Sequence, residues 1–292
     1  MNVMSSRRGG VVAAVAVLAL ASACSDDDGG TVVDTDVDQS QVGTCDPGGL
    51  PLKTAGKLTV GTDDPAYEPW FAEDDPSSGK GFESAVAYAV AGELGLDAAD
   101  VTWVKVPFNT SYQPGEKAFD FDINQISITV ERERAVDFSV PYYEATQAII
   151  MLKDSGYVGA TSLAELKDAR LGAQVGTTSL DAISQISPDV DPLVYDDTTK
   201  AAQALEDGQA DGIVADLPSA YYLASSEIAG ATIVGQFQPR LGVPEEFGLL
   251  LEKGSNLTPC VDAALTSLSA DGTLARLEKE WLAEATDVPE LD

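Results

Sequence analysis

Two arginines lie close together in the stretch "NQISITVERERAVDFSVPYY", residues 124–143, between two apolar runs. They are Arg132 and Arg134, and the whole chain contains only seven arginines. A guanidinium group binds a carboxylate through two parallel hydrogen bonds, which the ammonium group of lysine cannot do. One of the two arginines could therefore bind an anionic group. The alternation with Glu131 and Glu133 is equally typical of a solvated turn.

Two further segments place polar groups after apolar strands. In "AQVGTTSLDAI", Gly176 allows a close turn and residues 177–179 begin a helix. The free N–H groups and the dipole of a helix N-terminus bind anions, but ordinary N-capping by Thr or Ser explains the same pattern. In "GIVADLPSA", Asp216 follows an apolar strand and either caps the next helix or faces a ligand. A fixed cation and a fixed anion in one water-poor cleft would match a zwitterion.

Short apolar runs alternate with helical periodicity from Lys57 onward, which predicts an α/β fold with mainly parallel sheets flanked by helices. The folded part of roughly 240 residues is long for one such sheet and suits two lobes. A capping box is predicted at Ser162 and Glu165. Strands are expected at 58–62, 101–106, 119–129, 170–175, 193–195, 210–216 and 246–253, and helices at 82–95, 161–169, 178–186, 198–208, 218–227, 259–269 and 273–285.

Other motifs are too incomplete to predict chemistry. The chain has no His, so the commonest general base and metal ligand is missing. "DTDVD" and "FDFDINQISIT" resemble the start of calcium loops, but Gln39 and Gln125 stand where the loop glycine is required. "SSGK", residues 77–80, has the spacing of a penicillin-recognising serine, without the partner motifs, and is typical of a turn. We expect no metal, no cofactor and no catalytic residue.

Residues 1–23 have the pattern of an export signal. Arg7 and Arg8 precede the apolar stretch "VVAAVAVLAL", which is shorter than the roughly 20 residues of a membrane-spanning helix. The sequence "ASAC" is similar to a bacterial lipobox and predicts acylation of Cys24, although Ala21 stands where leucine is usual. An ordinary signal cut before residue 24, or export by the twin-arginine route, are the alternatives.

Composition predicts a tether and excludes some partners. Residues 24–54 are rich in Asp, Gly, Thr and Ser, and we expect them to form a flexible tether. The net charge of −31 excludes nucleic acid, and anionic lipid bound by charge, as partners. Attachment to the membrane would then depend on the lipid. The other two cysteines, Cys45 and Cys260, form an even pair in an oxidising compartment and predict a disulfide bond.

Several of these segments occur in the order found in amino-acid-binding extracytoplasmic proteins of ABC importers, solute-binding family 3. The resemblance covers about residues 57–285, and its most specific parts are "S-I-T-x-x-R" and the following "D-F-S-x-P-Y". It implies a fold like that of periplasmic binding proteins, with two crossover hinge strands. Lobe 1 would comprise 55–145 and 244–292, and lobe 2 would comprise 146–243. The family often has Asp where Glu83 and Ala85 stand here.

The resemblance also implies roles for individual residues in binding one free amino acid. Arg132 would pair with the α-carboxylate, helped by the helix start at Thr178 and Ser179. Asp216 would receive the α-ammonium group. The other implied site residues are Asn124, Gln125 and Ser127 as the frame, Tyr67, Trp70 and Phe108 as aromatic walls, and Asp63 or Asp64 near the side-chain end.

The expected function is that of a monomeric, lipid-anchored extracytoplasmic receptor that delivers an amino acid to an ABC permease. The acidic candidates at the side-chain end favour a polar or cationic ligand. Two other functions fit the same architecture. One is a secreted dehydratase-like enzyme, for which Glu83 or Glu144 would supply the acid. The other is a ligand-sensing partner of a membrane kinase.

Overall fold

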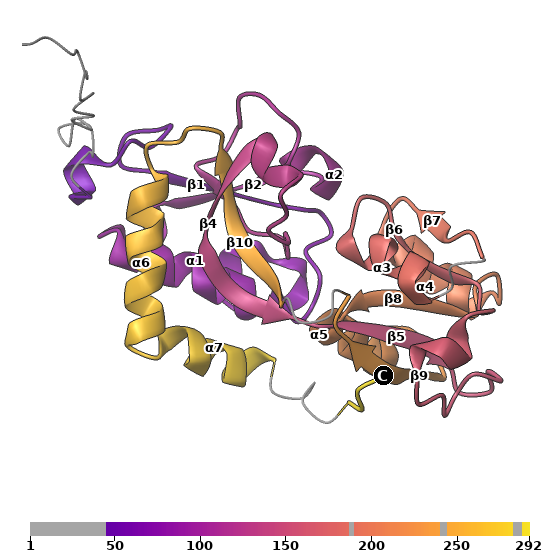
Figure 1. Cartoon of the computed structure of the whole chain (residues 1–292). Helices are drawn as coiled ribbons and strands as arrows, with labels where there is room; N and C mark the ends of the chain where they lie inside the picture. The colour runs from indigo at the N-terminus through magenta and orange to yellow at the C-terminus, as the bar shows by residue number, and fades with distance from the viewer. Residues whose placement is uncertain (1–44, 187–189, 240–243, 283–287) are drawn as a thin grey trace, which may run out of the picture. The chain divides into compact units, whose positions relative to one another are not determined.

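The computed structural model describes residues 45–186, 190–239, 244–282 and 288–292. The predicted export signal, Cys24 and most of the predicted tether lie outside these residues. The described chain forms two five-stranded sheets with helices packed against them (Figure 1). The predicted two-lobed α/β fold is confirmed. We call the part built on the first sheet lobe 1 and the part built on the second sheet lobe 2.

Lobe 1 has a sheet with the strand order β2-β1-β3-β10-β4. Alternate residues of β10 point to its two faces: Leu249 and Leu251 join the core under α1, α6 and α7, and Leu250 joins a smaller core with Phe108. The elements are β1 (Leu58–Thr62), α1 (Phe82–Glu93), β2 (Val101–Lys105), α2 (Phe108–Ser111), β3 (Phe121–Asp122), β4 (Val136–Ala145), β10 (Glu245–Glu252), α6 (Thr258–Ala270) and α7 (Thr273–Trp281).

Lobe 2 has the strand order β7-β6-β8-β5-β9. The same alternation in β5 sends Ala148 and Ile150 into a core with α4 and α5, and Ile149 and Met151 into a core with α3. The elements are β5 (Gln147–Leu152), β6 (Leu171–Gln174), α3 (Thr178–Ile186), β7 (Leu193–Tyr195), α4 (Thr198–Glu206), β8 (Gly212–Asp216), α5 (Leu217–Tyr222) and β9 (Ala231–Phe237).

The chain passes between the sheets at Thr146, between β4 and β5, and again between β9 and β10. Both sheets are mixed rather than mainly parallel. Three neighbouring strands are parallel in each sheet, and the fourth, β10 or β5, pairs antiparallel with both of its neighbours. These two strands are the ones that follow the crossovers, so the antiparallel pairing arises where the chain enters each lobe from the other.

Two local predictions were wrong. The strand expected at 119–129 is limited to β3, because Gln125 has a backbone φ of 47° and turns the chain away from the sheet. The helix expected at 161–169 is a single 3-10 turn, and Ser162 makes no side-chain cap. Glu165 instead accepts the N–H of Thr161 at 2.8 Å, so only the acidic half of the predicted capping box forms a bond.

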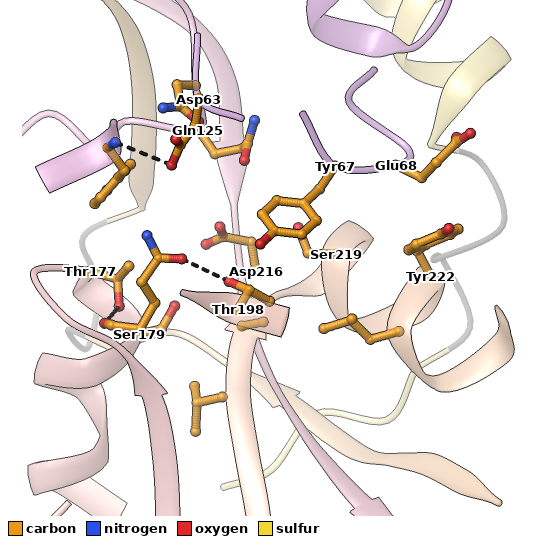
Figure 2. Close-up of a pocket in the computed structure, with 16 residues that line it drawn as sticks. Asp63, Tyr67, Glu68, Gln125, Thr177, Ser179, Thr198, Asp216, Ser219 and Tyr222 are labelled. Carbon is orange, nitrogen blue, oxygen red and sulfur yellow. Dashed lines mark hydrogen bonds between the residues drawn. The ribbon is translucent and has the colours of Figure 1, made fainter. Parts of the chain in front are cut away.

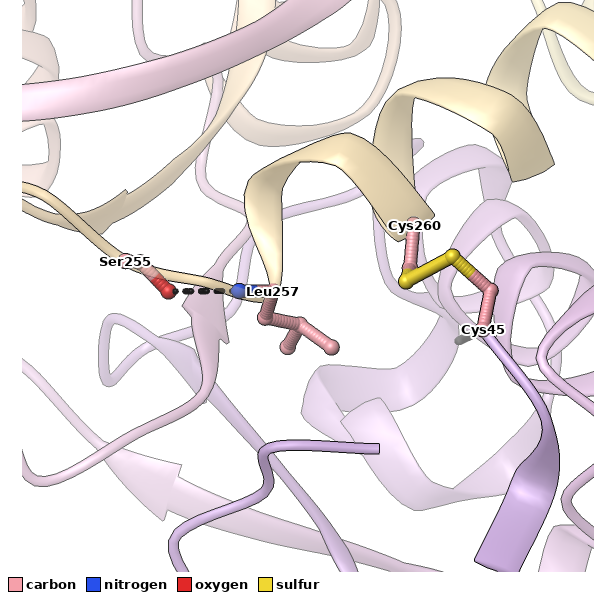
Figure 3. The surroundings of a disulfide bond; sticks show 4 residues. All are labelled: Cys45, Ser255, Leu257 and Cys260. Atoms are coloured by element: carbon pink, nitrogen blue, oxygen red, sulfur yellow. Dashed lines mark hydrogen bonds between the residues drawn. A yellow bond between two sulfur atoms is a disulfide. The ribbon is translucent and has the colours of Figure 1, made fainter. Parts of the chain in front are cut away.

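The segment before β1 is held against lobe 1, in contrast to the flexible tether expected up to residue 54. Cys45 forms the predicted disulfide bond with Cys260 of α6 (Figure 3). Leu50 and Leu52 are half-buried against the core of lobe 1. The backbone N–H of Lys53 donates to Asp120 at 2.7 Å. These contacts fix the described end of the tether to lobe 1.

The C-terminal residues differ from the prediction that 244–292 belong to lobe 1. Glu290 pairs with Gln236 of β9, and Leu291 is buried in the core beside α3. The N–H of Leu163 in lobe 2 donates to the carbonyl of Asp292 at 3.0 Å. The apolar side chains of Val288 and Leu291 and these backbone bonds therefore attach residues 288–292 to lobe 2. Within the described ranges, no helix is long and apolar enough to span a membrane.

Candidate functional site

A cavity of about 60 Å³ lies where the carboxyl ends of strands from both lobes meet (Figure 2). Strand ends of this kind are the usual ligand-binding edge of open α/β sheets. We call it the central cavity. Its lining residues follow β1, β3, β6 and β8 or lie on nearby helices: Asp63, Tyr67, Glu68, Phe108, Asn124, Gln125, Gln174, Thr177, Thr198, Ser179, Val214, Ala215, Asp216, Ser219, Tyr222 and Leu223.

The structure brings together only part of the predicted set at this cavity. The predicted residues that line it are Asp63, Tyr67, Phe108, Asn124, Gln125, Ser179 and Asp216. Those that do not are Asp64, Trp70, Ser127, Arg132 and Thr178. Arg132 and Thr178 line a neighbouring cavity of about 410 Å³, which we call the outer cavity.

Asp216, at the end of β8, is the acidic group on the lobe 2 side of the central cavity (Figure 2). Its carboxylate accepts a hydrogen bond of 2.7 Å from Nε2 of Gln147, and the same nitrogen donates to Glu245 at 2.9 Å. Burial raises the pKa of Asp216 well above its usual value, and the nearby Glu245 raises it further. The positive charge of Arg132 opposes both effects. An added cation would therefore favour the ionised form of Asp216.

Gln147, at the start of β5, connects this acid to the start of α3. It is fully buried, and its Oε1 accepts a bond of 2.7 Å from the hydroxyl of Ser179. Glu245 also accepts a bond of 2.6 Å from the hydroxyl of Ser127 in lobe 1. Gln147 of β5 and Glu245 of β10, the strands that follow the two crossovers, thus connect Asp216 and Ser179 in one hydrogen-bond network.

Asp63 occupies the opposite, lobe 1 side of the central cavity. Its carboxylate accepts the N–H of Asp64 at 2.8 Å and that of Phe108 at 3.2 Å. Burial raises the pKa of Asp63, and these two backbone bonds partly offset the effect. Tyr67 stands beside it, and its hydroxyl lies 3.1 Å from Oγ1 of Thr199 in lobe 2. A carboxylate and an aromatic ring therefore face the cavity from lobe 1.

The segment from Asn124 to Ser127 forms the lobe 1 edge nearest the hinge. Asn124 is 6% exposed, and its Nδ2 has no hydrogen-bond partner among the described residues. Ser127 lies against lobe 2, with its hydroxyl 3.1 Å from that of Thr178. This segment therefore places a residue with a buried, unpaired amide nitrogen at the cavity and makes a direct contact between the lobes.

The start of α3 is compatible with both roles that its sequence predicts, capping of the helix and binding of an anion. Oγ1 of Thr177 accepts the N–H of Leu180 at 3.1 Å, so Thr177 does cap the helix. The first N–H groups of a helix have no partner within the helix, and those of Thr178 and Ser179 belong to this first turn. Capping by Thr177 leaves these donors for an anion.

Arg132 is 7% exposed and begins a 3-10 turn that ends at Arg134, which is exposed. The guanidinium carbon of Arg132 lies 5.5 Å from the ring centre of Phe108 and 4.9 Å from that of Tyr112. Its two terminal nitrogens donate to the carbonyl of Ser127 at 2.7 Å and to that of Gly176, in lobe 2, at 3.0 Å. Each terminal nitrogen carries a second N–H, so two donors stay free for a carboxylate.

Two predicted site residues have other roles. Trp70 is buried in the core of lobe 1, packed edge-on against Phe82 and Tyr143. Its indole N–H donates to the hydroxyl of Ser219 in lobe 2 at 2.7 Å, so it contacts a lining residue rather than the cavity. Asp64 is exposed and forms an ion pair with Lys105 outside the cavity. Asp63, the neighbour of Asp64 in the sequence, lines the central cavity instead.

The sequence did not point to half of the lining residues. Thr198 and Gln174 form a hydrogen bond of 3.0 Å with each other at the cavity edge. Asp197 rather than Thr198 caps α4, because its carboxylate accepts a bond of 2.7 Å from the N–H of Lys200. Glu68, Ser219 and Tyr222 lie on a loop and a helix whose local pattern carries no signal for binding.

The acids that a dehydratase would require are not at the cavity. Glu83 is fully buried and accepts bonds from Gln125 and from the hydroxyl of Tyr142. Burial raises the pKa of Glu83 to about 7, against the opposing effect of these hydrogen bonds. Glu144 is exposed on β4. Neither side chain lines the central cavity.

Comparison with known proteins agrees with this architecture. Residues 58–284 match the family model of bacterial extracellular solute-binding proteins, family 3. The L-cystine-binding protein TcyJ of Escherichia coli K12 is 29% identical over 234 residues, which is 79% of this chain and 84% of that protein. The structure of an ancestral arginine-binding protein bound to glutamine has a TM-score of 0.64 and 30% identity, covering 78% of this chain and 98% of that one.

A third similar structure is that of an ancestral amino acid-binding protein described as a precursor of cyclohexadienyl dehydratase. It has a TM-score of 0.63 and 29% identity, and the match covers 78% of this chain and 95% of that one. All three relatives are named for binding an amino acid, and none is itself named as an enzyme.

Proposed function

Because this chain belongs to the bacterial extracellular solute-binding proteins of family 3, we propose that it binds a free amino acid between its lobes and delivers it to an ABC permease. It is a binding protein rather than an enzyme, as are its named relatives. The observation that carries the proposal is a cation and an anion on opposite lobes. Arg132 lines the outer cavity and Asp216 the central cavity. Hydrogen bonds through Ser127, Glu245 and Gln147 connect the two.

The ligand's α-ammonium group binds Asp216, and its α-carboxylate binds the free N–H groups of Arg132 and of the start of α3. This orientation is supported by charge, because a carboxylate placed beside Asp216 would be repelled. Arg132 also carries two spare donors. The ligand side chain then points toward Asp63 and Tyr67.

We further propose that the ligand's side chain ends in a positive or zwitterionic group. A third cavity, of about 320 Å³ and distinct from the outer cavity, shares Tyr67, Glu68, Tyr222 and Leu223 with the central cavity. Its other lining residues include three acids: Glu73, Asp74 and Glu227. Among the described residues, no Lys or Arg lines either cavity. L-Arginine and L-cystine have side chains of this type, and L-glutamate does not.

A thermal-shift panel of the 20 common amino acids and L-cystine tests this function. A ligand at a hundred times its dissociation constant stabilises the protein by about 2.7 kcal/mol, which gives a clear rise in the unfolding midpoint. We expect L-arginine or L-cystine to give the largest rise and L-glutamate to give none. A largest rise with L-glutamate would contradict the proposed side-chain chemistry. No rise with any of the 20 common amino acids or L-cystine would contradict amino-acid binding.

We also propose that Cys24 is acylated and anchors the protein outside the cytoplasm. The proposal rests on the lipobox-like "ASAC" and on the acidic segment that follows it. Mass spectrometry of the mature N-terminus should detect a lipid-modified Cys24. Cys24→Ala should release the protein from the membrane fraction, and retention of that variant would argue against the anchor.

A further inference from the structure

Gln125 has an unusual backbone conformation at the edge of the central cavity. Its φ of 47° lies in the left-handed region, which residues other than glycine seldom adopt. The chain on both sides is fixed by backbone bonds: the N–H of Ile123 donates to Gly61 at 2.9 Å, and the N–H of Gly248 donates to Ile126 at 3.2 Å. The chain must therefore turn at Gln125 between Ile123 and Ile126, whose positions are fixed by these bonds. Further hydrogen bonds are needed to stabilise the unfavourable backbone conformation of Gln125.

The carboxylate of Glu83 supplies that support. One of its oxygens accepts the backbone N–H of Gln125 at 2.7 Å, and the other accepts the side-chain amide of the same residue. Glu83 is 0% exposed and lies in the first turn of α1, so the rigid helix determines its position. Tyr142 donates its hydroxyl to the same carboxylate. One buried acid thus holds both the backbone and the side chain of Gln125.

The backbone conformation of Gln125 determines how the side chains of residues 124–127 face the ligand-binding cavity. Asn124 and Gln125 both line the cavity, and the free Nδ2 of Asn124 immediately precedes the left-handed turn. Rotation of the backbone at Gln125 would swing Asn124 away from the cavity and shift Ser127, which contacts Thr178 in lobe 2. A change at Glu83 should therefore reach the ligand although Glu83 does not line the cavity.

We propose that Glu83 is a positioning residue for ligand binding, which sets the conformation of residues 124–127 through its two hydrogen bonds to Gln125. This inference rests on the proposed amino-acid-binding function. Glu83 acts by geometry, so an uncharged side chain of the same shape can replace it. The carbonyl of Gln at position 83 can accept the backbone N–H of Gln125, and the two side-chain amides can pair after one of them flips.

A double-mutant cycle tests the proposal, because glycine adopts the left-handed conformation without support. Glu83→Ala should weaken binding about tenfold when Gln125 is present, and less than about threefold in the Gln125→Gly background. Glu83→Gln should stay within about threefold of the wild type. Binding is measured by calorimetric titration with L-cystine, L-arginine and L-glutamine, using the one that binds most tightly.

Tyr142→Phe is the matched control, because it removes a bond to Glu83 without touching Gln125. It should lower the unfolding midpoint and leave the dissociation constant within about threefold. Equal losses of affinity for Glu83→Ala with Gln125 and with Gly at position 125 would overturn the proposal, because they would mean that Glu83 acts only through general stability. If Glu83→Ala does not fold, Glu83→Asp, one methylene shorter, enters the same cycle under the same criterion.

Amide hydrogen exchange separates this inference from the proposed function. Exchange at the N–H of Gln125 needs no ligand and should be faster in Glu83→Ala or Glu83→Asp than in the wild type, and close to wild type in Tyr142→Phe. Unchanged exchange in both Glu83 variants would overturn the proposal. If the wild type binds none of the three amino acids, the proposed function fails, and exchange alone decides whether Glu83 holds the turn.

Discussion

Arg132→Ala should remove most of the affinity for the amino acid, whereas Arg134→Ala should change it little. The two arginines share one 3-10 turn, but Arg132 is buried against the rings of Phe108 and Tyr112 and Arg134 is exposed. Arg134 is therefore the matched control for the loss of one guanidinium group from this turn. Arg132→Lys keeps the charge and loses the planar fork, so it should recover only part of the affinity.

The magnitude follows from the bonds that Arg132 can make. Two charge-assisted bonds to the ligand carboxylate contribute about 1.5–3 kcal/mol each, so the expected loss is about 3–6 kcal/mol, or roughly two to four decades in affinity. The bonds from Arg132 to Ser127 and Gly176 are lost as well, which should lower the free energy of unfolding by about 1–3 kcal/mol. Arg134→Ala should change either quantity by less than about 1 kcal/mol.

Calorimetric titration with paired ligands separates recognition of the carboxylate from a purely structural role. Agmatine is L-arginine without its α-carboxylate, so the wild type should strongly prefer L-arginine to agmatine. In Arg132→Ala this preference should disappear, while in Arg134→Ala it should persist. Urea unfolding of each variant accounts for the change in stability. A preference that survives in Arg132→Ala, or a larger loss of affinity in Arg134→Ala, would refute the assignment of Arg132 to the ligand carboxylate.

Four other predictions concern the pKa of Asp216, the disulfide bond, the contact of Trp70 with lobe 2 and the closure of the lobes. Because burial raises the pKa of Asp216, binding of an ammonium group beside it should release protons, and affinity should rise with pH until Asp216 is ionised in the free protein. Calorimetric titration in buffers of different ionisation enthalpy should detect this proton release. Proton uptake on binding would contradict the role of Asp216. Reduction of the Cys45–Cys260 bond, which spans 215 residues, should lower the free energy of unfolding by about 4 kcal/mol; an unchanged calorimetric midpoint after reduction would show that the bond contributes little. Trp70→Phe removes a hydrogen bond between the lobes and should weaken binding about fivefold. In the wild type, small-angle scattering should detect contraction when ligand is added, because the lobes close on it. An unchanged radius of gyration would argue against closure.

Local sequence patterns predicted the elements that depend on local periodicity. The strand–helix alternation predicted β1, β2, β6, β7, β8 and β10 and the helices α1, α3, α4, α6 and α7 to within a few residues, but it did not predict β4, β5 and β9. The pattern failed at residues 119–129, where β-branched and polar residues alternate as in a strand. There the decisive contact is between Gln125 and Glu83, 42 positions apart, and no local pattern contains it.

The candidate site was predictable where a residue type is chemically distinctive. A guanidinium group after a strand or a carboxylate before a helix stands out in a sequence, as Arg132 and Asp216 did. Gln147 and Glu245 did not stand out, because a buried amide and an acid at a strand start have no special local pattern. Trp70 was expected at the cavity because it is aromatic, but its large apolar ring gains more from burial in the core of lobe 1.

The distribution of charge around the cavity explains why a cationic ligand should bind in one orientation. Burial raises the pKa values of Asp122 and Asp216 well above normal, and repulsion from neighbouring acids (Glu83 and Asp63 for Asp122, Glu245 and Glu83 for Asp216) raises them further. Burial also raises the pKa values of Asp63 and Glu83. Arg132 is the cation that acts on Asp216, and burial lowers its own pKa. The free site therefore has more buried acid than one guanidinium group can compensate. An ammonium group relieves that repulsion wherever it enters, but a carboxylate is favourable only beside Arg132 and the start of α3. Attraction thus brings the ligand's positive groups to the acids, and repulsion from the acids directs its carboxylate toward Arg132 and the start of α3.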